Sequence, residues 1–266
     1  EALSKAKYVK YVEPDSLMTI ADTDDGLSSY TYNSWGVEAM NADVAGEALA
    51  ETTSASIKVA VIDSGISAHA FLGSKRIAAY DYVNSDNDPS DENGHGTHVA
   101  GTIVDMTQAL NVYVVAYRTF DASGSGYTSN IVNAIKDAAD AGCKVINLSA
   151  RGAYTVYGYS AYYDAISYAV GKGATFCCAA GNDSSNTSGY VPACITISGC
   201  IVVASVGKTL SHSSFSNIGS SVDVSAPGES IVSCKYTGGY CVMSGTSMAT
   251  PHISAACAII KLKYPG

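Results

Sequence analysis

The stretch Lys58-Val-Ala-Val-Ile62 decides the fold class, because its apolar residues follow one another without alternating with polar ones. Three similar apolar runs lie further along the chain: Cys143–Leu148, Ala174–Ala179 and Cys200–Ala204. Such runs are typical of parallel strands that are covered on both faces. Helical periodicity separates them over Ser129–Ala141 and Tyr162–Val170. Strands that alternate with helices predict a three-layer α/β fold with a doubly wound, mainly parallel sheet.

Composition and two further patterns fit one large domain. The 266-residue chain is 47% hydrophobic and 15% charged, with a net charge of −9. That negative charge argues against nucleic acid or an anionic membrane as a partner, and no apolar stretch approaches the ~18 residues that span a bilayer. Asn111–Tyr117 is predicted to be another strand, and Gly238-Gly239 the turn of an antiparallel hairpin at the edge.

Three motifs carry the residue types of nucleophilic catalysis: Val59-Ala-Val-Ile-Asp63-Ser-Gly-Ile66, Asn93-Gly-His95-Gly-Thr-His-Val-Ala-Gly101 and Gly245-Thr-Ser247-Met-Ala-Thr-Pro-His252. A serine hydroxyl is a weak nucleophile at neutral pH and needs a base within hydrogen-bond reach. His95 suits that base, and a buried Asp63 would hold its imidazole in one tautomer. Ser247 is predicted at a helix start, where unpaired N–H groups and the helix dipole favour an oxyanion. Pro251 is expected near the first helical turn, where a missing N–H costs little.

The three motifs, in the order Asp63, His95 and Ser247, resemble the catalytic segments of the subtilisin-like serine peptidases, the subtilase family. The resemblance implies a serine endopeptidase that cuts polypeptide substrates through an acyl-enzyme intermediate, with no cofactor for catalysis. Zinc peptidase chemistry is the weaker alternative, because the histidines do not stand at metal-ligand spacing.

The same resemblance assigns the rest of the cleft. In Cys178-Ala-Ala-Gly-Asn182 the side chain of Asn182 would donate to the oxyanion beside the backbone N–H of Ser247. Substrate would lie as an added strand between extended segments. The residues expected to bind it are Gly124, Ser125, Gly126, Ser149, Ala150, Arg151, Gly152, Ala179, Ala180 and Gly181. Arg151 stands where the family has glycine. Its guanidinium either points into solvent or lies near the cleft and favours acidic substrate residues.

An oxygen-rich loop precedes the histidine motif and suits a structural Ca²⁺ ion, which takes six to eight oxygen ligands. The loop resembles a calcium loop of the family, and a solvated acidic loop is the alternative. A second calcium site would use Asp223 together with main-chain carbonyls. The expected metal ligands are Asp81, Asn84, Asp86, Asp88, Ser90 and Asp223.

Eight cysteines are many for a cytosolic enzyme of this size. Cys194 with Cys200, and Cys234 with Cys241, are close enough in sequence to predict two local disulfides in a secreted, extracellular protein. Eight free thiols in a reducing compartment is the alternative.

The N-terminal region differs in character from the rest. Tyr8–Asp15 is strand-like and resembles the end of an inhibitory propeptide of the family, with a plain edge strand as the alternative. We expect residues 1–20 to be a propeptide remnant, 21–34 a linker or mature N-terminal segment, and 35–266 the peptidase domain, without the family's usual C-terminal elements. The competing interpretation of the whole chain is a catalytically inert peptide-binding or zymogen-like form. Truncation or the tail in the cleft would then prevent catalysis.

Overall fold

A computed structural model describes residues 15–20, 23–24 and 34–265 of the chain. In this part a central parallel sheet has the strand order β12-β11-β9-β7-β3-β5-β4. Its strands are β3 (Ser56–Asp63), β4 (Arg76–Asp81), β5 (Asn111–Arg118), β7 (Val145–Leu148), β9 (Thr175–Ala179), β11 (Cys200–Val206) and β12 (Val224–Pro227). The predicted three-layer α/β fold is confirmed, and all four apolar runs are strands of this sheet.

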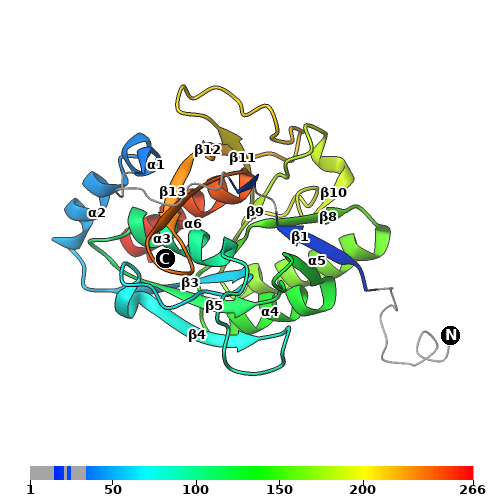
Figure 1. The fold of residues 1–266 in the computed structure, drawn as a ribbon, viewed down its shortest axis with the longest axis horizontal. Coiled ribbons are helices and arrows are strands. Elements are labelled where there is room, and N and C mark those ends of the chain that lie inside the picture. The colour runs from blue at the N-terminus through cyan, green and yellow to red at the C-terminus, as the bar shows by residue number, and fades with distance from the viewer. Residues whose placement is uncertain (1–14, 21–22, 25–33, 266) are drawn as a thin grey trace.

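Helices cover both faces of the sheet (Figure 1). One face packs against α3 (His95–Met106) and α6 (Thr246–Lys263). The shorter α2 (Ala42–Ala50), which follows α1 (Trp35–Ala39), packs on these two helices. The other face packs against α4 (Thr128–Asp140) and α5 (Val156–Gly171). The prediction of α5 started six residues too late, because Thr155 caps the helix by accepting a hydrogen bond from the amide of Gly158.

Two small antiparallel sheets flank the carboxyl ends of the parallel strands. One has the order β10-β8-β1-β6 and contains β1 (Leu17–Ile20), β6 (Ser125–Tyr127), β8 (Ala150–Ala153) and β10 (Tyr190–Val191). The other contains β2 (Thr23–Asp24), β13 (Ile231–Cys234) and β14 (Tyr240–Ser244), and it includes the predicted hairpin around Gly238-Gly239. A short 3-10 helix, η2 (Gly73–Lys75), precedes β4, and η3 (Thr187–Gly189) precedes β10.

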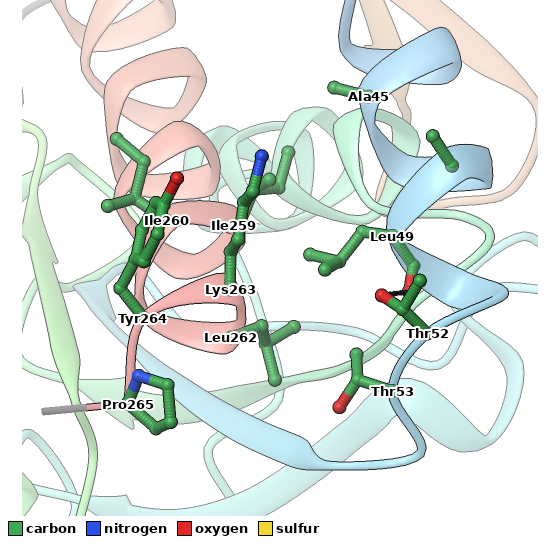
Figure 2. A pocket seen from close by; sticks show the side chains of 11 residues that line it. Ala45, Leu49, Thr52, Thr53, Ile259, Ile260, Leu262, Lys263, Tyr264 and Pro265 are labelled. Atoms are coloured by element: carbon green, nitrogen blue, oxygen red, sulfur yellow. Dashed lines mark hydrogen bonds between the residues drawn. The ribbon is translucent and has the colours of Figure 1, made fainter.

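The end of α6 is less covered than its start. Residues 246–255 are buried, whereas Ile260 and Tyr264 near the C-terminal end are 57% and 63% exposed. Figure 2 shows the groove of about 680 Å³ that lies there between α2 and α6, with Leu49 facing Leu262 across it. Ser247 lies at the other, buried end of α6.

The predicted disulfides are wrong for this structure, because all eight cysteines lie in the described part and no disulfide joins any of them. In the β13–β14 hairpin Cys234 lies opposite Tyr240, and Cys241 lies opposite Ser233. The two cysteines are therefore one residue out of register and project from opposite faces of the hairpin. Cys200 begins β11, and its side chain raises the pKa of the Cys178 thiol in the neighbouring strand β9. The extracellular location, which rested on these disulfides, stays a prediction.

Candidate active site

Asp63 and His95 form a buried pair at the carboxyl end of the parallel sheet. Asp63 is the last residue of β3 and His95 the first of α3, and neither is exposed. Nδ1 of His95 lies 2.7 Å from Oδ1 of Asp63. The same carboxylate oxygen accepts a 2.7 Å hydrogen bond from the backbone N–H of Ser64. These contacts fix both the carboxylate and the plane of the imidazole, as a general base requires.

The turn after β3 and the start of α3 are held together by a second buried acid that the sequence analysis did not single out. Asp91 accepts a hydrogen bond from the hydroxyl of Ser64 at 2.9 Å and from Thr97 at 2.9 Å (backbone N–H) and 2.6 Å (hydroxyl). Ser64 in turn accepts from the backbone N–H of Gly96 at 2.9 Å. A Cβ atom at Gly96 would collide with the carbonyl of Gly65 and lie 3.1 Å from Oδ1 of Asp63. Glycine at this position lets α3 approach the carboxylate closely.

Ser247 lies in the first turn of α6, and it is buried next to β8. Its hydroxyl donates a 2.8 Å hydrogen bond to the carbonyl of Ser149. Pro251 lies one turn further into α6 than the sequence analysis expected, so it removes the N–H that would normally bond to the carbonyl of Ser247. The hydroxyl of Ser149 donates to that carbonyl instead, at 2.9 Å. The missing backbone bond is thereby replaced by a residue that lies between β7 and β8.

A buried chain of polar side chains continues from this contact into the core. The amide of Asn147 donates to the hydroxyl of Ser149 at 3.0 Å, and its oxygen accepts from the hydroxyl of Ser254 at 2.8 Å. Asn147 belongs to β7 and Ser254 to α6. Asn147 therefore holds α6 directly at Ser254 and, through Ser149, at Ser247 about two turns earlier. This fixes the position of Ser247 relative to the sheet.

Asn182 follows β9 and faces the start of α6. Its side-chain oxygen accepts from the backbone N–H of Thr246 at 2.9 Å and from the hydroxyl of Thr246 at 2.8 Å. That hydroxyl also accepts from the backbone N–H of Gly181 at 3.1 Å. Because the oxygen end of the amide is bound to Thr246, the NH₂ end is turned away from it. The segment 179–181, expected to bind substrate, is buried and positions this amide.

The two extended segments predicted to bind a peptide flank a strand of the chain itself. β1 pairs antiparallel with β6 on one side, through Thr19 opposite Ser125, and with β8 on the other, through Thr19 opposite Arg151. Ile20 lies opposite Ala150, the residue next to Ser149. Strand β1 in this register therefore leads toward the pair formed by Ser149 and Ser247.

Glycines in both flanking segments leave room for the side chains of β1. Met18 is buried, and its sulfur fills the space that a Cβ atom of Gly152 would occupy. Gly124 has φ of +76°, and a Cβ atom there would lie 2.8 Å from Cδ1 of Ile20. The predicted strand-like piece Tyr8–Asp15 lies, except for Asp15, outside the described residues, and the strand observed is Leu17–Ile20.

The start of the described tail is anchored on α4. Asp15 accepts from the backbone N–H of Ser129 at 3.0 Å and from the hydroxyl of Ser129 at 2.5 Å. The carbonyl of Ser16 accepts from the backbone N–H of Thr128 at 2.9 Å. The tail thus supplies partners to unpaired donors at the start of α4, where a carboxylate also meets the positive end of the helix dipole.

In the loop from Asp81 to Ser90, the place of a cation at Asp81 is taken by an arginine. The carboxylate of Asp81 is buried and accepts from Nη1 of Arg118 at 3.0 Å and from the backbone N–H of Val83 at 2.7 Å. A guanidinium so close repels a cation, and no group of three or more acidic, histidine or cysteine residues in the described part is arranged to hold a metal. The other expected ligands make hydrogen bonds within the protein. Asn84 donates to Asp81, Asp86 accepts from the backbone N–H of Asp88, and Asp88 accepts from the hydroxyl of Ser90. Asp223 accepts from the backbone N–H of Val202.

Comparisons with known proteins show the family of the chain. The sequence profile of the subtilase family matches residues 54–266. The chain is 38% identical to alkaline serine exoprotease A of Vibrio alginolyticus over 94% of its own length and 47% of that protein. It is 41% identical to thermitase of Thermoactinomyces vulgaris over 76% of its length and 74% of thermitase. A third relative, the thermophilic serine proteinase of Bacillus sp. (strain AK1), is 38% identical and covered over 65% of its length.

Solved structures give the same result. A crystal structure of a cold adapted subtilisin-like serine proteinase matches with a TM-score of 0.74 at 39% identity, over 79% of this chain and 77% of that one. The chain spans only 47% of the length of alkaline serine exoprotease A and 65% of the length of the thermophilic serine proteinase. With the profile match, the identity to thermitase and the shared fold, the chain belongs to the subtilase family.

Proposed function

We propose that this chain is a serine endopeptidase with Ser247 as its nucleophile. The observation that carries the proposal is that an extended segment of polypeptide, Leu17–Ile20, lies between β6 and β8 and leads toward Ser149 and Ser247. A groove that pairs with main-chain groups on both sides accepts many sequences, because the hydrogen bonds go to the backbone. The family of the chain and the names of its relatives support the same reaction class.

The buried Asp63–His95 pair supports a triad mechanism. His95 takes the proton of the Ser247 hydroxyl as Oγ bonds to the carbonyl carbon of the substrate, and the imidazolium is stabilised by Asp63. His95 then gives that proton to the leaving amine as the C–N bond breaks, which leaves an acyl-enzyme ester. Water, deprotonated by His95, attacks the ester carbon. The bond from that carbon to Oγ then breaks, His95 returns the proton to Oγ of Ser247, and the new carboxyl group is released.

Asn182 and the backbone N–H of Ser247 are the proposed donors to the oxyanion. The support is the orientation of the Asn182 amide, whose oxygen end is held by Thr246. An oxyanion-hole donor of this kind typically contributes about 10²–10³ in turnover, a range that was measured on subtilisin itself. We expect a loss of the same order for Asn182→Ala.

We further propose that residues 1–20 act as an inhibitory tail, 21–34 as a linker and 35–266 as the peptidase domain. Strand β1 fills the groove that a substrate would use, and Asp15 and Ser16 fasten it to α4. The peptide bonds that follow Ile20 are the first expected to be cut. Substrates from outside must compete with this tail until it leaves.

The test is degradation of casein and of the chain itself, followed by electrophoresis and mass spectrometry. The wild type should lose a fragment ending within a few residues of Ile20 and then degrade casein. Ser247→Ala and His95→Ala should do neither, while the exposed control Ser220→Ala behaves as wild type. Casein degradation by pure Ser247→Ala protein would overturn the proposal.

A further inference from the structure

Arg151 occupies the flanking strand β8 at a position where glycine was expected, and its side chain lies against the described tail. Nη1 of Arg151 donates a 3.0 Å hydrogen bond to the side-chain hydroxyl of Thr19 in β1. The guanidinium also stacks on Tyr190 of β10, 5.6 Å from the ring centroid. A side chain of the enzyme strand therefore contacts a side chain of the bound segment, in addition to the main-chain pairing.

The charge of Arg151 is already paired within the enzyme. Nε lies 2.6 Å from Oδ2 of Asp183, and Nη2 donates to Oδ1 at 2.6 Å. Asp183 is itself fixed, because its backbone N–H donates to the side-chain oxygen of the buried Asn217 at 2.9 Å. The amide nitrogen of Asn217 lies 3.2 Å from Oδ2 of Asp183. A carboxylate on a bound peptide would meet a pair of opposite charges instead of a free cation.

The position of the guanidinium is set from both sides. A Cβ atom at Gly181 would lie 3.0 Å from Cδ of Arg151, so the stem of the arginine packs on the glycine next to Asn182. Three of the four partners of the side chain, Asp183, Tyr190 and Gly181, come from the enzyme. The one partner that a substrate would supply is the acceptor that Thr19 provides here.

We infer that Arg151 is a specificity-determining residue that favours an uncharged hydrogen-bond acceptor, such as a hydroxyl or carboxamide, at the substrate position filled by Thr19. This inference rests on the proposed function, since it describes the selectivity of the same cleft. Asp183 sets the charge preference: paired with Asp183, Arg151 gives no advantage to an acidic side chain over its amide. The hydrogen bond is partly open to solvent, which predicts an effect of about two- to tenfold rather than a strict requirement.

The experiment uses the peptide of residues 15–24 with Thr or Val at position 19. Both peptides compete in one reaction with the self-processed enzyme, and mass spectrometry follows their loss. Thr and Val have the same shape, so the ratio of the two kcat/KM values isolates the hydroxyl. The wild type should cut the Thr peptide about two- to tenfold faster, and Arg151→Met, which keeps the stem, should bring the ratio to about one. An unchanged ratio in Arg151→Met would overturn the inference.

A second pair of peptides tests the role of Asp183, with Asp or Asn at position 19. The wild type should cut the two at similar rates. Asp183→Asn exposes the charge of Arg151, so the Asp peptide should then be cut several-fold faster than the Asn peptide. A strong preference for Asp in the wild type, or no change in Asp183→Asn, would contradict this part.

If the proposed function is wrong, no peptide is cut at all. That result can therefore be told apart from a failure of this inference, in which peptides are cut without the expected preference. When no peptide is cut, the inference is read from hydrogen exchange of the Ile20 amide, which bonds to the carbonyl of Gly124, in the Ser247→Ala chain. Thr19→Val and Arg151→Met should each speed exchange about two- to tenfold, and the double variant should show no further increase. If the two substitutions speed exchange independently, so that their effects multiply in the double variant, the inference is overturned. This outcome does not depend on catalysis.

Discussion

Ser149 and Ser247 exchange two hydrogen bonds: each hydroxyl donates to the main-chain carbonyl of the other residue, at 2.9 Å and 2.8 Å. The bond from Ser149 satisfies the carbonyl that Pro251 deprives of its helical partner. The pair joins β8, where the described tail is bound, to the first turn of α6, where the proposed nucleophile lies. A shift of the backbone at the start of β8 should therefore also shift Ser247.

Removing the Ser149 hydroxyl should destabilise the protein by about 1–3 kcal/mol, because the buried carbonyl of Ser247 loses its donor. Pro251→Ala restores a backbone N–H one turn away. It should therefore cost less stability in the Ser149→Ala background than in the wild type. Urea unfolding of the two single variants and the double variant measures this coupling. Purely additive effects would show that the two donors do not serve the same carbonyl.

Gly96→Ala should reduce peptidase activity by about a hundredfold or more, since a misplacement of about 1 Å can cost that much. The added Cβ atom meets the carbonyl of Gly65 and approaches Asp63, so α3 and His95 must shift. Gly171→Ala is the matched control, because a Cβ atom there has open space around it. Both variants are compared by kcat/KM on one peptide. Equal activities would mean that the close approach at Gly96 is not needed.

Acid should destabilise the protein through two histidines outside the proposed triad. Burial lowers the pKa of His98 to about 3 and that of His252 to about 4, from an ordinary 6.5. Between pH 6.5 and about 4 the unfolded chain binds protons that the folded chain does not. Stability is therefore fully present above pH 6.5 and falls as the pH drops, by up to about 1.4 kcal/mol per pH unit for each histidine.

Unfolding free energies at a series of pH values test this slope. His252→Gln should lower this slope by the part that one histidine contributes. The control His212→Gln, at an exposed position, should leave the slope unchanged. An identical slope in His252→Gln and wild type would contradict the assignment.

Chelation of divalent metal should not destabilise the Asp81–Ser90 loop, because Arg118 already supplies a positive charge to Asp81. The midpoint of thermal unfolding should therefore not change through this loop. Arg118→Met should instead cost about 3–5 kcal/mol, since it leaves the carboxylate of Asp81 buried without a cation. The control is Lys172→Met, which breaks a solvent-exposed pair with Asp140 and should change the stability little. A large drop in the midpoint with chelator, restored by calcium, would show that this prediction is wrong.

Local patterns in the sequence carried the prediction of the fold. The apolar runs that became β3, β7, β9 and β11 are each visible within a few residues, and a parallel sheet places the residues after its strands at one edge. Asp63 and Asn182 were therefore predicted at that edge from the strands that precede them, and the structure places them there.

Contacts between distant residues escaped the sequence analysis. Arg118 meets Asp81 across 37 positions and Arg151 meets Asp183 across 32, and no local pattern marks such pairs. The calcium prediction counted the oxygen-bearing residues of one loop. The sequence does not show that the guanidinium of Arg118 binds the carboxylate of Asp81 there. The disulfide prediction counted spacing, whereas strand register decides which face a cysteine occupies. The strand at Leu17–Ile20 depends on β6 and β8, which lie more than a hundred residues later.

The central claim is that Ser247 is a nucleophile in a groove that the N-terminal tail can fill. Its most direct test is covalent labelling with a serine-directed fluorophosphonate, with the modified peptide identified by mass spectrometry before and after the tail is released. We predict one label, on Ser247, that appears as the tail leaves and is absent from His95→Ala and Ser247→Ala. Labelling of another serine, or no label on the chain once the tail has been removed, would contradict the claim.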